Sequence, residues 1–563
     1  MGTALENQTP LARLYHWEKT SGDKVHFTQP VGNGQVVEYT WKEAMRQVRS
    51  MAAYLQSLDL PAGSQIALIG KNSAHWMMAD WAIWMAGHCT VPIYPTLNAE
   101  TVAYILDHSE SKLLFVGKLD DWDHMKPGVP EGMPMIDLPL APPNNGQSWD
   151  DIVAANAPLQ GEPDRGMEEL ATIVYTSGST GQPKGVMHNF NALRVCGSSM
   201  TDLMETKGLR VGEDDRLLSY LPLAHVFERV CVENLSIYRG CQVFFAESLD
   251  TFVQDLQRAR PTIFFSVPRL WTKFQAGVCA KLPLKKQKVL FKIPLLGSKV
   301  KNKILTQLGL QHVRFAGTGS APLSADTINW YRSLGLELLE GYGMSENMAY
   351  SHFNKPGEAQ VGTVGTNNPG VVTKIGDNGE ILIKSPADMV GYFKDEEKTR
   401  ESFTDDGFLK TGDMGQIDAS GRLKITGRVK ELFKISKGKY VAPAPIENKI
   451  VNHPAIEAVC VAGANQPATF AQIMLCEEAQ AQATSSEGRA ELEQEISQLI
   501  DEVNTTLDHH ERMQFAVVVK EQWGIENGFL TPTMKIKRNV LEQHYEPKIE
   551  TWYAARQKVI WDQ

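Results

Sequence analysis

Short apolar segments alternate with helical patterns along most of the chain, and this alternation limits the folds that the chain can adopt. The runs SQIALIGKN, KLLFVGK, CQVFFAES and PTIFFSVPR each have the length of a buried strand. They are separated by segments such as TWKEAMRQVRSMAAYLQSL, in which apolar residues recur every three to four positions. Because strands that alternate with helices pair in parallel, the sequence predicts an α/β fold with a parallel sheet.

The sequence changes character toward its C-terminal end. From Gly379 onward, turn-rich strand patterns such as GEILIKSP and GRLKITGR predict a small β unit. Beyond about Arg428, helical and strand patterns are mixed, which is typical of a separate α+β domain. We therefore expect an N-terminal domain at residues 1–427 and a smaller, mobile C-terminal domain at residues 428–563. Within the latter, AQAQATSSEG at residues 479–488 predicts a solvated loop.

Composition places the chain among ordinary globular proteins. Hydrophobic residues make up 42% and charged residues 22% of its 563 residues, which excludes collagen-like and disordered classes. The formal net charge of −10 argues against a general nucleic-acid binder, because phosphate contacts require an excess of cations. No two of the seven cysteines lie within four residues of each other, so we expect no zinc or redox site of the CxxC type.

The sequence contains no pattern that predicts a membrane span. Its first residues lack the apolar core of a signal peptide. The most apolar stretch, from Met77 to Tyr94, contains Asp80, His88 and Pro92, and we interpret it as a buried helix followed by a strand. We therefore expect a cytoplasmic protein whose contact with a membrane, if any, is peripheral.

A segment rich in hydroxyl groups and glycines follows the apolar run LATIVY. From Thr176 to Gly185 it reads TSGSTGQPKG, with four hydroxyl side chains, three glycines and Lys184. Glycines let backbone N–H groups approach phosphate oxygens, hydroxyls donate further hydrogen bonds, and the lysine adds positive charge. The segment predicts a phosphate-binding loop, although it does not match the Walker A pattern GxxxxGK[ST]. A flexible Ser/Gly loop without a ligand is the alternative.

Two other glycine-containing segments resemble enzyme motifs but depart from them. The segment GTGSAP has Pro322 where the dinucleotide-binding pattern GxGxxG requires a glycine. The segment GMSEN has Asn347 where the GxSxG nucleophile motif of hydrolases requires a glycine. We therefore predict neither a dinucleotide-binding fold nor a hydrolase serine.

Seven motifs follow one another along the sequence: YTSGSTGQPKG, YLPLAHVFER, GTGSAPLS, EGYGMSE, KTGD, GRVKELFKISKGKYVAP and NGFLTPTMKIKR. In this order they resemble the motifs of one enzyme superfamily, the adenylate-forming acyl-CoA synthetases. They are most similar to the motifs of long-chain fatty acyl-CoA ligases, including the bubblegum-type branch. The resemblance therefore covers most of the chain.

This resemblance implies a two-step reaction. A carboxylate attacks the α-phosphate of ATP to give acyl-AMP and pyrophosphate, and the CoA thiolate then displaces AMP to give a thioester. Because an anion attacks a polyanion, the site needs Mg²⁺ and lysines that stabilise charge on the phosphate oxygens. By resemblance, Glu346 binds Mg²⁺ with Thr176 near the same metal, and Lys184 contacts the phosphates. His225 is a candidate at the junction of the acyl group and CoA, and a structural role is its alternative.

The resemblance also assigns residues to the nucleotide. Asp413 matches the carboxylate that accepts hydrogen bonds from both ribose hydroxyls, and Arg428 supports the same ribose. Tyr342 can stack on adenine, and Ser345 stands where the family more often has threonine. The other predicted ATP- and AMP-binding residues are Thr176, Ser177, Gly178, Ser179, Thr180, Gly181, Gly319, Ser320, Glu340 and Gly341.

By the same resemblance, motifs of the C-terminal region act in adenylation, the first step, and in the domain movement that leads to thioester formation, the second step. Lys535 matches the lysine that stabilises charge during adenylation, and Lys537 is the alternative. Met534 precedes Lys535, at a position where the family usually has glycine. Lys430 matches the hinge about which the C-terminal domain moves, and the loop at Gly438 would line the CoA tunnel.

Both the carboxylic acid that is activated and the thiol that accepts the acyl group have alternatives within the same chemistry. The predicted function is ATP-dependent ligation of a long-chain fatty acid to CoA. A medium-chain or aryl acid, or acyl carrier protein in place of CoA, would use the same adenylation step. A catalytically silent fatty-acid binding or trafficking module is a second alternative, disfavoured because Lys184, Glu346, Asp413 and Lys535 are all present.

Positive charge is concentrated in one segment of this acidic chain. Residues 256–325 contain thirteen Lys and Arg residues and no Asp or Glu. Within them, KLPLKKQKVLFKIPLLGSKVKNKIL interleaves lysines with large apolar side chains. This pattern is typical of a segment that lies on an anionic membrane surface. A solvated basic face and a site for the CoA phosphates are the alternatives.

Overall fold

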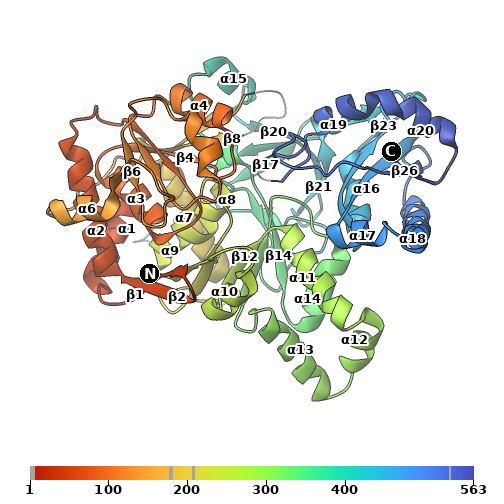
Figure 1. The fold of residues 1–563 in the computed structure, drawn as a ribbon, viewed down its shortest axis with the longest axis horizontal. Coiled ribbons are helices and arrows are strands. Elements are labelled where there is room, and N and C mark those ends of the chain that lie inside the picture. Colours follow the sequence, from red (N-terminus) through yellow and green to blue (C-terminus); the bar gives the residue numbers. More distant parts are fainter. Residues whose placement is uncertain (1–6, 177–181, 206–208, 532–533, 563) are drawn as a thin grey trace. The chain divides into compact units, whose positions relative to one another are not determined.

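The computed structural model describes residues 7–176, 182–205, 209–531 and 534–562 and divides into two compact units (Figure 1). The N-terminal unit extends to Ala321 and also includes Ile328–Thr373 and Ile383–Leu409. The C-terminal unit comprises Pro322–Thr327, Lys374–Leu382 and the chain from Lys410 onward. The large N-terminal part is mixed α/β and the smaller C-terminal part is α+β, which confirms the predicted fold class.

An eight-stranded sheet forms the centre of the N-terminal unit, in the order β19-β9-β8-β4-β3-β5-β6-β7. From β8 to β7 neighbouring strands are parallel, whereas β9 is antiparallel to both β8 and β19. The parallel part is the sheet that the alternating pattern predicts. The strands of the whole sheet are β3 (Gln65–Ile69), β4 (Cys89–Ile93), β5 (Leu114–Val116), β6 (Met135–Asp137), β7 (Gln147–Ser148), β8 (Leu170–Thr176), β9 (Lys184–Asn189) and β19 (Gly391–Tyr392).

The most apolar stretch of the sequence is a buried helix followed by a strand, as predicted. Helix α3 (Ala74–Met85) is buried at every position, and it leads into β4. A helix surrounded by protein on all sides is apolar all round, which explains why it resembles a membrane segment in sequence. Among the residues that the structure describes, no helix is both long and apolar enough to span a bilayer.

Two further sheets belong mainly to the same unit. One has the order β10-β11-β1-β2, and the other has the order β12-β13-β14-β15-β16, with β12, β13 and β14 parallel. The strands are β1 (Val25–Gly32), β2 (Gln35–Thr40), β10 (Arg216–Ser219), β11 (Gln242–Phe245), β12 (Ile263–Ser266), β13 (Phe315–Thr318), β14 (Leu338–Tyr342), β15 (His352–Phe353) and β16 (Thr366–Asn367).

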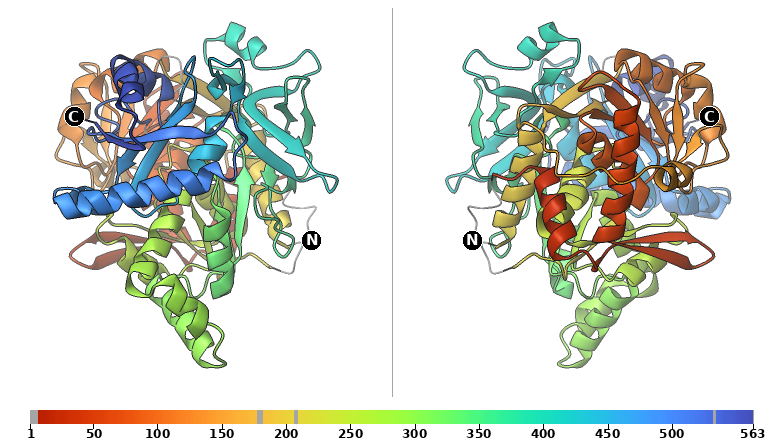
Figure 2. Two further views of the ribbon diagram at one scale, coloured as in Figure 1. Left: turned by 90° about the vertical axis from the view of Figure 1, so that its right-hand side faces the viewer. Right: turned by 90° about the vertical axis from the view of Figure 1, so that its left-hand side faces the viewer.

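Most helices of this part of the chain cover the sheets, but two extend away from the strands. Figures 1 and 2 show α12 and α13 projecting together beyond β12 and β14. The helices are α1 (Pro10–Thr20), α2 (Trp41–Ser57), α4 (Ala99–His108), α5 (Trp122–Met125), α6 (Trp149–Ala155), α7 (Phe190–Glu205), α8 (Val226–Glu228), α9 (Leu235–Arg239), α10 (Phe252–Ala259), α11 (Pro268–Lys281), α12 (Leu284–Leu290), α13 (Leu296–Gln307), α14 (Ala325–Leu334) and α15 (Glu396–Glu401).

Three of the points that divide the two units lie within or just before the predicted small β unit, which begins at Gly379. These points fall within β17 (Val372–Ile375) and β18 (Glu380–Lys384) and at the first residue of β20 (Leu409–Ile417). In the C-terminal unit, β20 pairs antiparallel with β21 (Leu423–Arg428), and β22 (Phe433–Lys434) pairs with β23 (Tyr440–Val441).

The C-terminal unit has its own sheet, in the order β24-β25-β26-β27, with a core on each face. Val459 and Val461 of β24 belong to one core and Cys460 and Ala462 to the other, as the alternation of side chains along a strand requires. The elements are β24 (Ile456–Ala462), β25 (Thr469–Leu475), β26 (Met513–Val518), β27 (Val559–Trp561), α16 (Pro443–Ile450), α17 (Glu477–Gln482), α18 (Ser486–Asn504), α19 (Arg538–Tyr545) and α20 (Ile549–Ala555).

The predicted loop at residues 479–488 is largely helical. It consists of the end of α17, a short connection and the start of α18. The Ser485 side chain accepts a hydrogen bond from the Gly488 N–H at 3.0 Å and caps α18. The polar composition that is typical of a loop is here the composition of a helix N-terminus, so this prediction is wrong.

Candidate active site

Thr176 and Lys184 are cross-strand partners at the ends of β8 and β9. The segment between them contains the predicted phosphate-binding residues Ser177, Gly178, Ser179, Thr180 and Gly181, which lie outside the described residues. Both flanking side chains are partly buried. The antiparallel pairing therefore presents a hydroxyl and an ammonium group at the two ends of the glycine-rich segment.

Tyr392 connects Lys184 with Glu346. Its hydroxyl donates a hydrogen bond to Glu346 Oε1 at 2.8 Å, and Lys184 Nζ lies 5.4 Å from the centroid of its ring. The pairing of β19 with β9 places Tyr392 opposite Val186. Because Lys184 and Val186 are two residues apart, they share one face of β9 with the tyrosine. Burial, and next the Glu346 carboxylate, raise the pKa of Tyr392, so its hydroxyl keeps the proton that it donates.

The backbone at Glu346 is held from two sides. Glu346 lies in a short 3-10 helix (Ser345–Asn347). His188 Nε2 donates a hydrogen bond to the Ser345 carbonyl at 2.7 Å, and burial lowers the pKa of His188 to about 4, so the ring is neutral at pH 7. On the other side, the Met389 N–H donates to the Glu346 carbonyl at 2.7 Å. These contacts fix the position from which the carboxylate projects.

The residues predicted to bind adenine come together at the ends of two parallel strands. Gly319 and Ser320 follow β13, whereas Glu340, Gly341 and Tyr342 end β14, and Thr318 is paired with Glu340. In open α/β sheets, ligands bind beyond the carboxyl ends of parallel strands. A Cβ at Gly319 would lie 3.4 Å from the Gly341 carbonyl oxygen, so the two segments approach closely.

His225 has a structural contact in this fold. Its Nδ1 accepts a hydrogen bond from the Phe227 N–H at 3.1 Å and caps α8. Glu228, at the end of this helix, is buried and accepts hydrogen bonds from Ser219 Oγ and the Tyr220 N–H, both at 2.9 Å. Burial raises the pKa of Glu228 to about 8. The YLPLAHVFER motif therefore includes residues that determine local structure.

An ionic cluster that the sequence did not predict continues from this motif. Arg229 pairs with Asp80 of α3 and with Glu233, whose oxygen lies 3.2 Å from Arg229 Nε, and all three side chains are buried. Arg229 Nη1 also donates to Thr172 Oγ1 at 2.8 Å. Asp80 thus has a partner in the protein, which explains the carboxylate within the otherwise apolar α3.

Asp413 and Arg428 form an ion pair within the C-terminal unit. They are directly opposite each other in β20 and β21, and Arg428 Nε donates to Asp413 Oδ1 at 2.9 Å. The preceding Gly412 has φ +71° and donates its N–H to Glu380 Oε1 at 2.9 Å, which fixes the backbone next to Asp413. The carboxylate and guanidinium predicted to bind one ribose are therefore neighbours.

Lys535 lies on an exposed turn of the C-terminal unit. Its N–H donates to Thr531 Oγ1 at 3.0 Å, and the Thr531 N–H donates to its carbonyl at 2.8 Å. Met534 has φ +61°, the left-handed conformation that glycine adopts without strain. The family glycine expected at this position therefore has a structural reason. Arg538 anchors the start of α19 through Glu447 at 2.5 Å.

The predicted hinge and loop residues are also exposed. Lys430 lies in a short 3-10 helix (Val429–Glu431) directly after β21. Gly438 has φ +80° in the turn between β22 and β23, and its N–H donates to the Ile435 carbonyl at 2.9 Å. A residue with a bulky side chain at this position would be strained.

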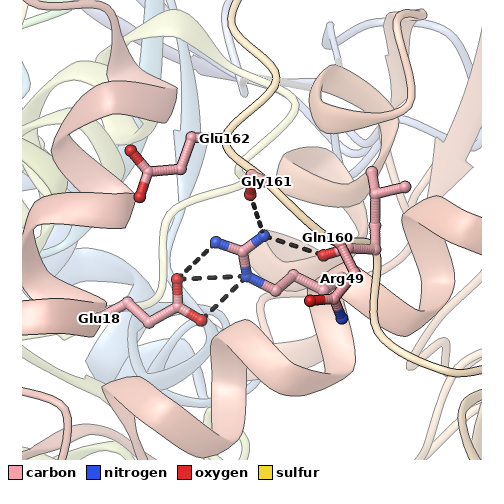
Figure 3. A pocket seen from close by; sticks show the side chains of 6 residues that line it. Glu18, Arg49, Gln160, Gly161 and Glu162 are labelled. Carbon is pink, nitrogen blue, oxygen red and sulfur yellow. Dashed lines mark hydrogen bonds and ion pairs between the residues drawn. The ribbon is translucent and has the colours of Figure 1, made fainter.

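A separate surface hollow near α1 and α2 contains none of the predicted site residues (Figure 3). Its centre is Arg49, which pairs with Glu18 at 2.7 Å and donates to the carbonyls of Leu159 and Gly161 at 3.0 and 2.7 Å. The arginine thus fastens the segment that precedes β8 to the helical layer. We assign this hollow a structural role.

Comparison with protein families identifies the class of enzyme. The model described as "AMP-binding enzyme" matches residues 14–393, and the model of the AMP-binding enzyme C-terminal domain matches residues 431–557. These matches define an adenylate-forming enzyme of the AMP-forming acyl-CoA ligase type. The chain belongs to the AMP-binding enzyme family, as its motifs predict.

Individual relatives align over almost the whole chain. The long-chain-fatty-acid–CoA ligase FadD15 of Mycobacterium bovis is 31% identical, with 98% of each chain covered. The human long-chain-fatty-acid–CoA ligase 1 is 30% identical over 92% of this chain and 83% of its own. Among solved structures, the adenylation domain of a carboxylate reductase from Mycobacterium chelonae has a TM-score of 0.82 at 21% identity, covering 98% and 93% of the two chains. This last similarity concerns the fold alone.

Proposed function

We propose that the enzyme ligates a long-chain fatty acid to CoA through an acyl-AMP intermediate. The connection of Lys184 to Glu346 through Tyr392 carries the chemical part of the proposal, because it gathers a cation and a carboxylate beside the glycine-rich segment. The substrate part is supported by the relatives that are named long-chain-fatty-acid–CoA ligases. The motif residues Lys184, Glu346, Asp413 and Lys535 are all present, which disfavours a silent binding module.

The residues at Glu346 fit the requirements of Mg²⁺. Magnesium in nucleotide sites uses one or two carboxylates together with phosphate oxygens and water. Tyr392 bonds to Oε1 of Glu346, and a carboxylate has further acceptor positions on Oε2. Glu346 would hold the ion with Thr176 nearby, and Mg²⁺ would neutralise phosphate charge.

In the first half-reaction, protein cations oppose the charge that develops as the carboxylate attacks ATP. Lys184 contacts the phosphates, and Lys535 stabilises charge between the α-phosphate and the attacking oxygen. Asp413, oriented by Arg428, accepts hydrogen bonds from the ribose hydroxyls. Adenine binds beyond β13 and β14, where Tyr342 stacks on the base.

In the second half-reaction, the C-terminal domain changes its position so that CoA reaches acyl-AMP. We place the domain boundary between residues 427 and 428, the pivot at Lys430 and the CoA passage at the Gly438 loop. The exposed position of Lys430 immediately after β21 supports this assignment, because a pivot must change its backbone angles without disrupting a core. His225 would act at the junction of acyl group and thiol.

A panel of carboxylic acids tests the substrate and the acceptor together. Pyrophosphate release with ATP and Mg²⁺ should be fastest with long-chain acids, and the thioester should form with CoA. A preference for medium-chain or aryl acids would replace the proposed substrate class. Transfer to acyl carrier protein in preference to CoA would replace the acceptor, and absence of pyrophosphate release with every acid would contradict the catalytic proposal.

A further inference from the structure

Helix α12 buries one polar side chain, Gln287, and exposes two large apolar side chains together with its lysines. Gln287 is 1% exposed: its Oε1 accepts a hydrogen bond from Trp330 Nε1 at 2.8 Å, and its Nε2 donates to the Leu282 carbonyl at 2.6 Å. Leu284 and Val289 of the same helix are 45% and 65% exposed. A polar anchor therefore fixes the helix, while Leu284 and Val289 are exposed to solvent.

The turn that follows α12 continues this apolar surface. Ile293, Leu295 and Leu296 are all exposed, and Leu295 is 83% exposed. Leu295 also has φ +62° and ψ −45°, a conformation that costs free energy for a residue with a Cβ. The fold thus holds a leucine in a strained conformation in which it buries little surface. Its apolar side chain is therefore accessible to a partner outside the chain.

The charge around these side chains has one sign. Between α12 and α13 and within both helices, six lysines are exposed: Lys285, Lys286, Lys288, Lys292, Lys299 and Lys303. Over the described residues, none of these six forms an ion pair with a carboxylate, and residues 256–325 contain no Asp or Glu. Figures 1 and 2 show that both helices extend away from the neighbouring strands. The lysines and the exposed apolar residues therefore lie on the same projecting segment of the chain.

We propose that the hairpin at residues 284–307 is a peripheral anchor for an anionic lipid bilayer. Val289, Leu295 and Leu296 enter the region between headgroups and acyl chains, and the exposed lysines contact the phosphates of the headgroups. Exposed leucines would contribute little to a complex with nucleic acid or with the CoA phosphates, whereas a bilayer accepts both kinds of side chain. This anchor is independent of the proposed ligation chemistry.

Sedimentation with vesicles tests the cationic part of the anchor. The full chain should bind vesicles of phosphatidylcholine and phosphatidylglycerol in equal amounts, should bind phosphatidylcholine alone weakly, and should dissociate as salt is added. The triple variant Lys285→Gln, Lys286→Gln and Lys288→Gln should lower the partition coefficient on the order of 100-fold, since each lysine near the surface contributes roughly fivefold. The matched variant Lys42→Gln, Lys112→Gln and Lys520→Gln has the same net charge and alters three other exposed lysines, and it should lower binding far less.

A leucine substitution separates a membrane from a soluble polyanion. Leu295→Ser should lower binding to the anionic vesicles about tenfold, because one buried leucine side chain is lost from the bilayer. Leu249 is 91% exposed and lies outside the hairpin, so Leu249→Ser should leave vesicle binding unchanged. Every variant should keep the circular dichroism spectrum and the thermal midpoint of the parent chain. A change in vesicle binding then results from the altered surface and not from a loss of folding.

Three results would overturn the proposal. One is a full chain that does not sediment with the anionic vesicles at low salt. Another is vesicle binding that the lysine variant lowers but Leu295→Ser does not, if the full chain also binds heparin as tightly as it binds the anionic vesicles. This result would identify a soluble polyanion as the partner. The third is unchanged vesicle binding in the hairpin lysine variant with a raised KM for CoA, which would assign the lysines to the CoA phosphates.

Discussion

The two lysines proposed to act on the phosphates have different surroundings in the two units. Lys184 is partly buried on β9, opposite Thr176, and contacts the ring of Tyr392. Lys535 is exposed, and its main-chain groups form hydrogen bonds with the side chain and the main chain of Thr531. A lysine built into a sheet has one position throughout a reaction, whereas a lysine on an exposed turn can serve one step and leave before the next. The difference therefore predicts that Lys535 is specific to one half-reaction.

The largest effect is expected from Lys535→Ala. Adenylation, measured as acid-dependent ATP–pyrophosphate exchange, should fall by about 10²–10³-fold, corresponding to about 2.7–4 kcal/mol for the loss of one preorganised charge-stabilising group. Thioester formation from supplied acyl-AMP should largely survive. Lys537→Ala, two residues away, is the control and should retain most of the exchange. Equal loss in both half-reactions of the Lys535 variant would contradict the specific role, and loss in the Lys537 variant alone would transfer the role to that lysine.

Thioester formation, the second half-reaction, should be slowed by substitutions at the hinge residue Lys430 and in the loop at Gly438. Lys430→Pro restricts the backbone at the pivot, and Gly438→Trp narrows the proposed CoA passage. In each variant the rate of thioester formation from acyl-AMP should fall about tenfold or more relative to the exchange rate, if the domain movement limits that step. Gly438→Asn keeps a residue that tolerates the left-handed conformation at φ +80° and should have the smaller effect. Loss of exchange with intact thioester formation would refute this assignment.

The sequence predicts elements more reliably than it predicts contacts between distant segments. Strands β3 and β5 are short apolar runs, so local pattern suffices to find them. The contact between Tyr392 and Glu346 joins residues 46 positions apart and exists because β19 pairs with β9. No local pattern marks Tyr392, since a single tyrosine in GYF is compatible with an ordinary edge strand.

The same limit explains two further differences between sequence and structure. The Arg229 cluster depends on Asp80, which the sequence shows only as a charge in an apolar stretch. The composition of residues 479–488 predicts a loop, because composition does not distinguish a polar loop from the capped start of a helix. In both cases the missing information is the partner of a polar side chain.

Tyr392→Phe, a substitution beside the sheet-bound Lys184, should lower the rate of adenylation by an intermediate amount. The variant keeps the ring beside Lys184 but removes the hydroxyl that orients Glu346, and a hydrogen bond to a charged group corresponds to about tenfold in rate. We expect slower adenylation and a higher Mg²⁺ concentration at half-maximal rate. Tyr350→Phe removes a tyrosine hydroxyl that donates to the Pro369 carbonyl at 3.0 Å, and it should leave the Mg²⁺ dependence unchanged. An unchanged Mg²⁺ dependence in Tyr392→Phe would show that this tyrosine does not position the metal carboxylate.

The smallest effects are expected at Met534, whose backbone conformation sets the turn before Lys535. Met534→Gly removes the strain at φ +61°, but it also increases the conformational entropy of the unfolded chain, so the two contributions of about 1 kcal/mol each should nearly cancel. The thermal midpoint and the exchange rate should therefore stay close to those of the parent chain. Met534→Val places a β-branched residue in the left-handed region and should lower the exchange rate several-fold, because the turn must change to relieve the clash. Met534→Ala controls for the loss of the long side chain. If valine, alanine and glycine at this position gave the same exchange rate, the conformation of the turn would not determine how Lys535 acts, and the contrast with the sheet-bound Lys184 would rest on exposure alone.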